Sequence, residues 1–225
     1  MKTVSITIDG NEITAREGEK LLWVALDNGI YIPNLCALRE NPEVFAGCRL
    51  CFVEVEGNKR AVAACTVKVT GGMVVSTRGE NALRLARSGF ELLMSSHPVD
   101  CAHCTRSGSC ELQKIAKHLG AKLKTKRLRN LQRHLPIDDS HPLFIYDPNK
   151  CVLCGRCVWV CQQHPGAGVF GFAHRGFERV ISTFCDEPMG AYRCENCTEC
   201  INVCPTGALV LKDEEISEVK TKGEP

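Results

Sequence analysis

Hydrophobic and polar residues alternate along residues 4–8 and again along 12–16, which predicts two short strands. The sequence D-G-N at 9–11 predicts a turn between them, because these residue types tolerate a positive φ. An apolar run over 21–28 predicts a packed helix, and Gly29 is placed to be its C-cap. The chain is therefore expected to open with a β-hairpin followed by a helix.

Two further strand-like runs and a long helix follow. The runs are 51–56 and 67–75, and glycine-containing turns separate them. Hairpin, helix, cysteines and then more strands is the order of a β-grasp domain of the ferredoxin type. Thr77 and Glu80 form a T-x-x-E capping box, which predicts a helix over 78–95 with Thr77 at its N-cap.

The cysteine content narrows the class of protein. Sixteen of the 225 residues are cysteine, a density near that of disulfide scaffolds, which are normally short and secreted. This chain is longer, and its start has none of the features of a signal peptide. No apolar run approaches the roughly 18 residues of a spanning helix. We therefore expect a cytoplasmic protein with no membrane span, whose cysteines bind metal.

Two C-x2-C-x2-C-x3-C runs, at 151–161 and 194–204, have the ligand spacing of a pair of [4Fe–4S] clusters. In such pairs, the fourth cysteine of each run binds the other cluster. One predicted ligand set is Cys151, Cys154, Cys157 and Cys204, and the other is Cys161, Cys194, Cys197 and Cys200. Zinc knuckles or disulfides are the alternatives, but zinc sites usually lack a third cysteine at the next step.

The N-terminal cysteines predict a [2Fe–2S] cluster. Its ligands would be Cys36, Cys48, Cys51 and Cys65, spaced C-x11-C-x2-C-x13-C. The plant-type pattern is C-x4-C-x2-C…C, so the match is partial. Gly47 fits a loop whose amides point at cluster sulfur. A zinc ribbon is the alternative, since there is a single C-x2-C pair.

A third group of cysteines is one ligand short of a [4Fe–4S] cluster. It consists of Cys101, Cys104 and Cys110. His97 and His103 are the candidates for the fourth ligand. His103 lies inside the C-x2-C loop, where a further ligand would be cramped, so His97 is favoured. A zinc site with three cysteines and one histidine stays open.

Residues 111–134 carry eight Lys and Arg against the single acid Glu111. This stretch could be a solvated face, a subunit contact, a counter-charge to the clusters or a nucleic-acid site. It has no aromatic residue for base stacking, so no nucleic acid is expected as a partner.

Four features of the C-terminal half bear on the fold. G-A-G-V-F-G at 166–171 fits G-x-G-x-x-G, but no predicted strand precedes it, so we do not interpret it as a nucleotide motif. Strand-like residues at 169–170 and 179–181 predict a short hairpin between the two cysteine runs. Cys185 belongs to no ligand set and is expected to be a buried free thiol. The charged residues 213–225 are expected to be disordered.

The ordered cysteine series and the stretch S-H-P-V-D-C-A-H-C-T-R-S-G-S-C-E-L-Q at 96–113 resemble a known family. It comprises the N-terminal part of the large iron–sulfur subunit of complex I and the N-terminus of multi-domain iron-only hydrogenases. As a separate chain, the sequence is similar to the diaphorase-side iron–sulfur subunit of NAD(P)-linked hydrogenases. The resemblance covers residues 1 to about 212. In this family, the histidine at the position of His97 binds the cluster.

The resemblance implies an α+β fold of three cluster-binding domains. They are a β-grasp [2Fe–2S] domain, a small helical domain with a [4Fe–4S] cluster bound by histidine and three cysteines, and a bacterial-ferredoxin-like domain with two [4Fe–4S] clusters. The predicted boundaries are 1–78, 79–118, 119–140 for a basic linker, 141–212, and 213–225 for a charged tail.

The resemblance also implies a function, namely electron relay with no catalytic residue in this chain. FMN and NAD(P) would belong to a partner diaphorase subunit. The second partner would be a hydrogenase or, alternatively, a formate dehydrogenase or a complex I-like enzyme. A free multi-cluster ferredoxin and a zinc-dependent binding protein are further alternatives.

Overall fold

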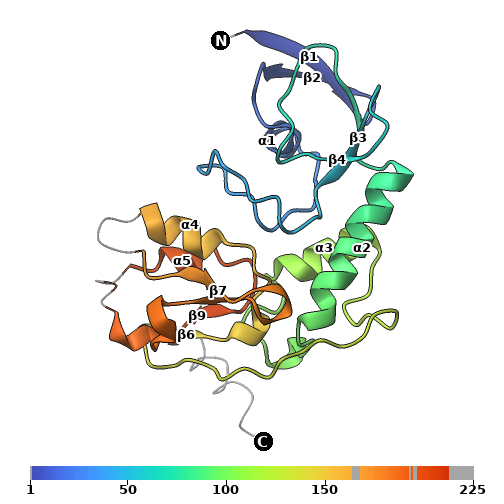
Figure 1. Ribbon diagram of the computed structural model, residues 1–225. Coiled ribbons are helices and arrows are strands. Elements are labelled where there is room, and N and C mark those ends of the chain that lie inside the picture. Colours follow the sequence, from blue (N-terminus) through green and yellow to red (C-terminus); the bar gives the residue numbers. More distant parts are fainter. Residues whose placement is uncertain (1, 164–167, 193, 195–196, 213–225) are drawn as a thin grey trace, which may run out of the picture. The chain divides into compact units, whose positions relative to one another are not determined.

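The computed structural model describes residues 2–163, 168–192, 194 and 197–212. The chain divides into two compact units, and Figure 1 labels their helices and strands. The first consists of Met1–Leu93 and Ile115–Lys122, and the second of Met94–Lys114 and Leu123–Pro225. The domain boundaries given above stay predictions.

The first unit contains a five-stranded sheet with the order β2-β1-β5-β3-β4. Its strands are β1 (Thr3–Ile8), β2 (Asn11–Arg16), β3 (Phe52–Val55), β4 (Val62–Ala63) and β5 (Val74–Ser76). β1 pairs with β2 as an antiparallel hairpin and with β5 in parallel. Helix α1 (Leu21–Asp27) lies in sequence between β2 and β3. The β-grasp prediction is therefore confirmed.

The alternation along the first strand explains how this core forms. Val4, Ile6 and Ile8 are buried in one cluster with the apolar residues of α1, while the residues between them face outward or are partly covered. Complete burial of such a side chain contributes about 1.5–3 kcal/mol. The cluster also contains Cys51 and Cys65, so the core of this unit fixes two predicted ligands.

The predicted strand at 67–75 is wrong over most of its length. Only β5, at its end, joins the sheet. The amide of Val69 donates instead to the carbonyl of Glu19, and the amide of Leu21 donates to the carbonyl of Val67. Residues 67–69 thus bond to the segment that leads into α1, and this pairing is not visible in a local pattern.

Helix α2 spans Glu80–Ser96, and Thr77 is not its N-cap. Both the amide and the hydroxyl of Thr77 donate to the carboxylate of Asp9. The carboxylate of Glu54, on β3, accepts from the amides of Asn81 at 2.8 Å and Ala82 at 3.2 Å. A residue distant in sequence therefore caps the helix, and the capping-box prediction was wrong about its donor and acceptor.

The second unit contains two short antiparallel sheets of two strands each, together with two helices. The sheets pair β6 (Phe144–Tyr146) with β9 (Leu209–Leu211), and β7 (Gly171–Ala173) with β8 (Val180–Ser182). The helices are α4 (Arg156–Gln163) and α5 (Glu199–Asn202), and α3 (Glu111–Leu119) follows the third cysteine group. Short 3-10 turns lie at Cys101–His103, Pro148–Lys150, Gly176–Glu178, Phe184–Asp186 and Met189–Ala191. The mixed helix and strand content agrees with the predicted α+β class.

The spacer between the two cysteine runs forms the predicted hairpin, although its first strand begins at Gly171 and not at residue 169. Gly168, a glycine of the G-x-G-x-x-G pattern, therefore lies before a strand, whereas a nucleotide motif follows one. Residues 166 and 167 of this pattern lie outside the described part of the chain. Residues 213–225 lie outside it as well. Within the described ranges, no helix is long and apolar enough to cross a membrane.

Cys185 is exposed, so the expectation of a buried thiol was wrong. It lies in the turn Phe184–Asp186 with φ 54°, and Asp186 also has a positive φ. This backbone conformation turns the chain outward after β8 and carries the thiol into solvent.

Candidate iron–sulfur centres

Four cysteines come together in the first unit. They are Cys36, Cys48, Cys51 and Cys65, and none is more than 5 % exposed. The Sγ atoms of Cys36 and Cys48 are 3.5 Å apart. The amide of Ala64 donates to the carbonyl of Cys51 at 2.8 Å, which joins the strand of Cys51 to the segment of Cys65. The first predicted ligand set therefore forms one buried group of thiols.

These thiols change one another's pKa values. The hydrogen bond with Cys48 and burial raise the pKa of Cys36, whereas the same bond lowers the pKa of Cys48 to about 6. In a second pair, the bond with Cys65 raises the pKa of Cys51, and the pKa of Cys65 is lowered. Burial opposes a fully ionised group of four thiolates unless cations offset their charge. An iron cluster provides such cations, so this donor set fits a [2Fe–2S] cluster.

The loop around Cys48 directs backbone amides toward its sulfur. Such amides, including that of Leu50, further lower the pKa of Cys48. Hydrogen bonds of this kind tune the potential of a cluster. The residues with a positive φ in this loop are Ala46 and Arg49, and not Gly47, which the sequence had singled out.

The second unit contains the third cysteine group. Cys101 and Cys104 lie in and directly after the 3-10 turn Cys101–His103, and Cys110 precedes α3. All three are half-buried, and burial raises the pKa of Cys110.

His97 and His103 differ sharply in their surroundings. The His103 side chain is 80 % exposed, and its Nδ1 lies 2.9 Å from the carboxylate of Asp100. The Nδ1 of His97 is buried and has no hydrogen-bond partner among the described residues. Burial, and then the charge of Lys150, lower the pKa of His97 to about 4. At neutral pH it is therefore the neutral imidazole that binds metals.

A buried polar atom without a partner costs about 1–3 kcal/mol. This cost would be relieved if Nδ1 bound a metal, so the surroundings of His97 fit a cluster ligand better than the exposed, carboxylate-paired His103 does. The geometry thus favours the same histidine as the argument from the sequence.

The first cysteine run of the ferredoxin-like part lies in a loop that leads into α4. Leu153 and Gly155 have φ values of 53° and 77°, which curl the loop, and the amide of Leu153 donates to Cys151 Sγ at 3.4 Å. Burial raises the pKa of Cys151 to about 11 and that of Cys154 to about 12. Burial also raises the pKa of Cys157.

The fourth cysteine of each run has its thiol close to cysteines of the other run. Cys204 acts on the pKa of Cys151, Cys154 and Cys157, so its thiol lies with the first run. Burial raises the pKa of Cys200 to about 12, and the second-largest cause is Cys161 from the first run. The amide of Val169 donates to Cys161 Sγ at 3.2 Å.

Cys194 and Cys197, the other cysteines of the second run, also lie near Cys200. Cys194 and Cys197 both act on Cys200, and burial and then Cys161 raise the pKa of Cys194. Burial disfavours the thiolate forms of Cys157, Cys194 and Cys200 unless cations offset their charge. Bound iron would provide such cations, so these donor sets fit [4Fe–4S] clusters.

The loop that contains Cys104 packs closely on the chain after Cys204, and the sequence did not predict this packing. A Cβ atom at Gly207 would lie 3.0 Å from Cys104 Sγ. The Arg106 guanidinium donates to the carbonyl of Cys204 at 2.9 Å, and the amide of Glu111 donates to the carbonyl of Pro205 at 3.3 Å. The loop of the His97 group therefore packs on the chain that directly follows Cys204.

In the described part of the chain, no three or more His, Cys, Asp or Glu side chains are arranged as ligands of a single metal ion.

Three family models match successive parts of the chain. Residues 1–80 match a 2Fe-2S iron-sulfur cluster binding domain, and residues 87–123 match an NADH-ubiquinone oxidoreductase-G iron-sulfur binding region. Residues 142–210 match the ferredoxin-like domain of NADH-quinone oxidoreductase subunit 3. The chain therefore has both 2Fe-2S and 4Fe-4S regions.

Curated relatives cover nearly all of this chain. It is 38 % identical over 215 residues to the HndD subunit of the NADP-reducing hydrogenase of Solidesulfovibrio fructosivorans, covering 93 % of this chain and 36 % of that protein. It is 37 % identical to the alpha subunit of the NADPH-Fe(3+) oxidoreductase of Geobacter sulfurreducens, covering 93 % and 24 %. This chain thus spans about a quarter to a third of the length of these two relatives.

A relative of matching length is the gamma subunit of the NAD-reducing hydrogenase HoxS of Cupriavidus necator. The identity is 32 % over 211 residues, which cover 93 % of this chain and 88 % of that protein. Among solved structures, a chain of an NAD+-reducing [NiFe]-hydrogenase in the H2-reduced state matches with a TM-score of 0.81 and 31 % identity. The match covers 93 % of this chain and 87 % of that one.

Proposed function

Because this chain belongs to the family of iron–sulfur proteins that includes the gamma subunit of the NAD-reducing hydrogenase HoxS, we propose that it relays electrons within an oxidoreductase complex. Its partners would be a flavin subunit that oxidises or reduces NAD(P)(H) and a hydrogenase subunit. FMN and NAD(P) would bind to the first of these partners. This chain would have no substrate site of its own.

Four clusters would occupy the chain, one [2Fe–2S] and three [4Fe–4S]. The ligand sets are Cys36, Cys48, Cys51 and Cys65; His97, Cys101, Cys104 and Cys110; Cys151, Cys154, Cys157 and Cys204; and Cys161, Cys194, Cys197 and Cys200. When bound, such clusters supply one-electron oxidation and reduction. The chain's own residues bury these groups, exclude water and direct amides at the sulfur atoms, and these are the means by which proteins set cluster potentials.

The contact between Gly207 and Cys104 carries the relay proposal. A relay needs neighbouring centres with a short gap between them, and here only one backbone segment separates Cys104 from Cys204. Arg106 fixes the gap through its bond to the Cys204 carbonyl. The absence of a side chain at Gly207 keeps the two groups close.

The share of each relative's length that this chain covers favours a hydrogenase complex over the alternative complexes. This chain spans 88 % of the gamma subunit of HoxS. It spans 28 % of the mitochondrial 78 kDa subunit of NADH-ubiquinone oxidoreductase of Candida albicans, to which it is 31 % identical. The remaining alternatives are a formate dehydrogenase relay and a free multi-cluster ferredoxin.

Anaerobic purification of the tagged chain, with iron analysis and mass spectrometry, tests this function. We expect about 14 iron atoms per chain from one [2Fe–2S] and three [4Fe–4S] clusters, together with a flavin subunit and a hydrogenase subunit. A brown chain recovered alone would favour the free ferredoxin. A colourless, zinc-loaded chain would refute the iron–sulfur assignment altogether.

A further inference from the structure

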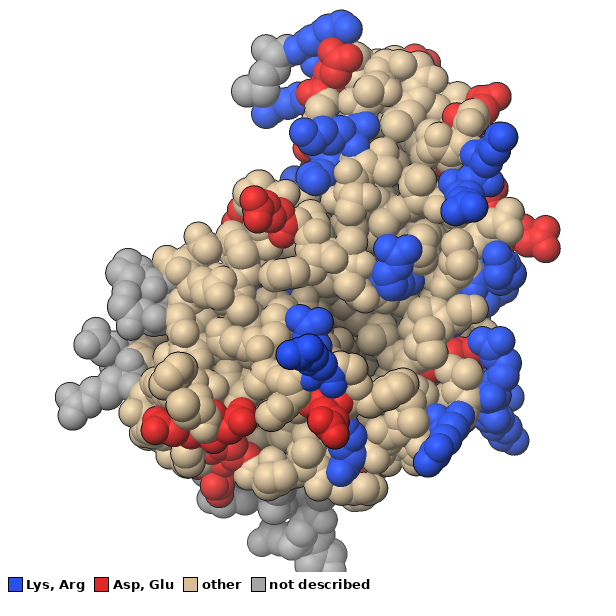
Figure 2. Space-filling view, in the orientation of Figure 1, with Lys and Arg blue, Asp and Glu red and all other residues tan. Residues whose placement is uncertain are grey.

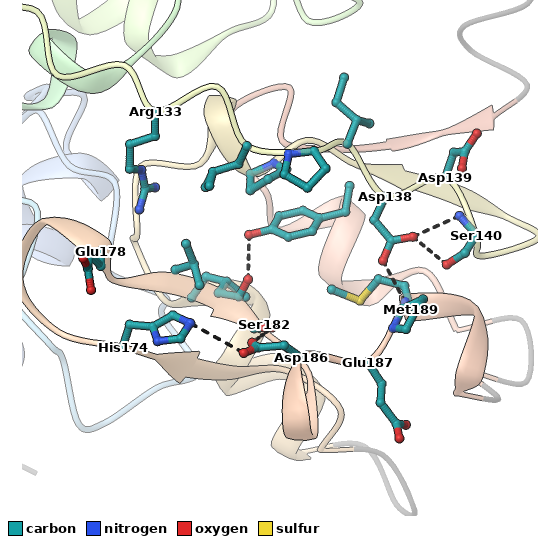
Figure 3. Close-up of a pocket in the computed structure, with 18 residues that line it drawn as sticks. Arg133, Asp138, Asp139, Ser140, His174, Glu178, Ser182, Asp186, Glu187 and Met189 are labelled. Carbon is teal, nitrogen blue, oxygen red and sulfur yellow. Dashed lines mark hydrogen bonds and ion pairs between the residues drawn. The ribbon is translucent and has the colours of Figure 1, made fainter.

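A groove of about 810 Å³ lies in the second unit (Figure 3). Its walls come from the linker residues 133–140 and from residues 174–189 of the spacer between the two cysteine runs. Tyr146, Ile181 and Met189 contribute a buried apolar floor. The volume is within the range of about 300–1,000 Å³ that is typical of ligand sites.

Hydrogen bonds hold the two walls in place. Asp138 Oδ2 accepts from the amide of Met189 at 2.8 Å, a bond that Figure 3 shows across the groove. The Arg133 guanidinium donates to the carbonyl of Arg179 at 2.8 Å. The groove is therefore formed before anything binds, which lowers the ordering cost of association.

The rim of the groove is acidic. Five carboxylates line it, those of Asp138, Asp139, Glu178, Asp186 and Glu187, against one guanidinium, that of Arg133. Asp186 also lies 3.5 Å from His174 Nε2. Among the described residues, Asp139, Glu178 and Glu187 have no ion-pair partner for their carboxylates. Figure 2 shows acidic side chains gathered at the lower left of the face in view.

Large apolar side chains stand exposed beside this rim. Phe177 is 83 % exposed, Phe184 is 78 % exposed, and Ile137, in the groove itself, is 57 % exposed. Exposed apolar residues that cluster around a concave site mark interaction surfaces, and aromatic residues and methionine are enriched at the centres of interfaces.

We propose that this groove, defined by linker residues 133–140 and spacer residues 174–189, binds a segment of a partner subunit in which an apolar side chain is flanked by Lys or Arg. The apolar side chain would lie on the floor, and the basic residues would pair with Asp139, Glu178 and Glu187. This inference rests on the proposed function, because it requires that the chain works as a subunit.

Charge argues against the chain's own C-terminal residues as the occupant of the groove. Residues 213–225 contain five acidic residues and two lysines, so their net charge has the same sign as the rim. Like charges brought together disfavour binding. A basic segment of another protein has the complementary charge.

The groove also lies close to one of the proposed ligand sets. Tyr146 forms part of the floor and donates through its hydroxyl to the Ile181 carbonyl at 2.8 Å. Tyr146 lies in one buried cluster with Cys157, and Cys151 packs against this cluster. A segment bound in the groove is thus separated by one aromatic side chain from Cys151, so docking there would bring the partner close to the cluster that Cys151 helps to bind.

A cross-linking experiment on the complex identifies the occupant. Ile137 is replaced by a photoreactive phenylalanine analogue in the full chain, and the anaerobically purified complex is irradiated and digested. We expect a cross-link to one partner peptide that has Lys or Arg beside an apolar residue. A cross-link to residues 213–225, to a second copy of this chain or to an acidic peptide would overturn the proposal, and so would no cross-link to a partner.

Charge reversal tests the rim in the same complex. The double variant Asp139→Lys/Glu187→Lys is compared with Glu12→Lys/Glu56→Lys, which makes the same charge change at exposed positions of the first unit. We expect the groove variant to bind the partner about 10-fold or more weakly at low salt, with a smaller difference at high salt. The control should bind as wild type, and both variants should keep wild-type iron content and visible spectra.

The outcomes separate this inference from the proposed function. If wild type recovers its partners and the groove variant binds them equally well, the groove proposal fails and the relay function stands. If wild type recovers no partner subunit, both fail. If the double variant does not retain iron, Asp139→Lys and Glu187→Lys are measured singly, and unchanged affinity in both would equally refute the proposal.

Discussion

Replacing Gly207 with alanine should disturb the centre that contains Cys104 and leave the other centres intact. Gly207 has no positive φ, so alanine fits its backbone conformation, and the added Cβ atom is the whole perturbation. That atom would lie 3.0 Å from Cys104 Sγ and 3.6 Å from Arg106 Cγ. Favourable contacts between heavy atoms begin at about 3.5 Å, so one group must move by a few tenths of an ångström.

The size of the effect depends on whether the Cys104 sulfur or the Gly207 backbone can shift. A cysteine sulfur bound to iron is held by its bond, and the backbone of Gly207 is held by the neighbouring Thr206 hydroxyl, which donates to the Lys150 carbonyl at 2.9 Å. Insertion of a methyl group into such a site costs about 1–3 kcal/mol. We expect this cost to appear as weaker cluster retention at the His97, Cys101, Cys104 and Cys110 site.

The assay is anaerobic iron analysis combined with EPR of the reduced protein at several potentials. Gly171→Ala is the matched control, since Gly171 is in the same unit, has no positive φ and has no atom within 4 Å of its added Cβ. Gly207→Ala should lose or shift the signal of one [4Fe–4S] cluster, and Gly171→Ala should match wild type. Unchanged signals, potentials and thermal stability in Gly207→Ala would refute the close packing on which the relay argument rests.

Three further outcomes are expected. His97→Ala should remove one [4Fe–4S] signal by EPR and about four iron atoms, whereas His103→Ala should keep both, and loss of the cluster in His103→Ala alone would reverse the assignment. Glu54→Ala should lower the free energy of unfolding by about 1–2 kcal/mol through loss of a helix cap, measured by anaerobic denaturant titration, while Glu56→Ala should have little effect and equal losses would contradict the capping role. Cys185 should be the one thiol that iodoacetamide alkylates in the intact protein, as mass spectrometry would show, and a protected Cys185 would contradict its exposure.

The cysteine spacing made most of the site predictable from sequence. Short gaps such as those between Cys151, Cys154 and Cys157 restrict the loop so tightly that few arrangements of the thiols are possible. The same motif predicts reciprocal roles for Cys161 and Cys204, and the thiol of each lies near cysteines of the other run. The choice between His97 and His103 had less support from the sequence, because it rested on steric crowding in a loop and on the family resemblance.

The sequence alone therefore determined the opening hairpin, the helix predicted at 21–28 and the family, because each depends on residues close together in the chain. Tertiary structure alone decided that Glu54 caps α2, that residues 67–69 leave the sheet, that Cys185 is exposed and that Gly207 touches Cys104. Each of these depends on contacts between distant segments, whose energies are fixed only when the packed fold brings the atoms together. Local patterns record the propensities of neighbouring residues, and they contain no information about which distant segment will satisfy an exposed amide or approach a sulfur atom.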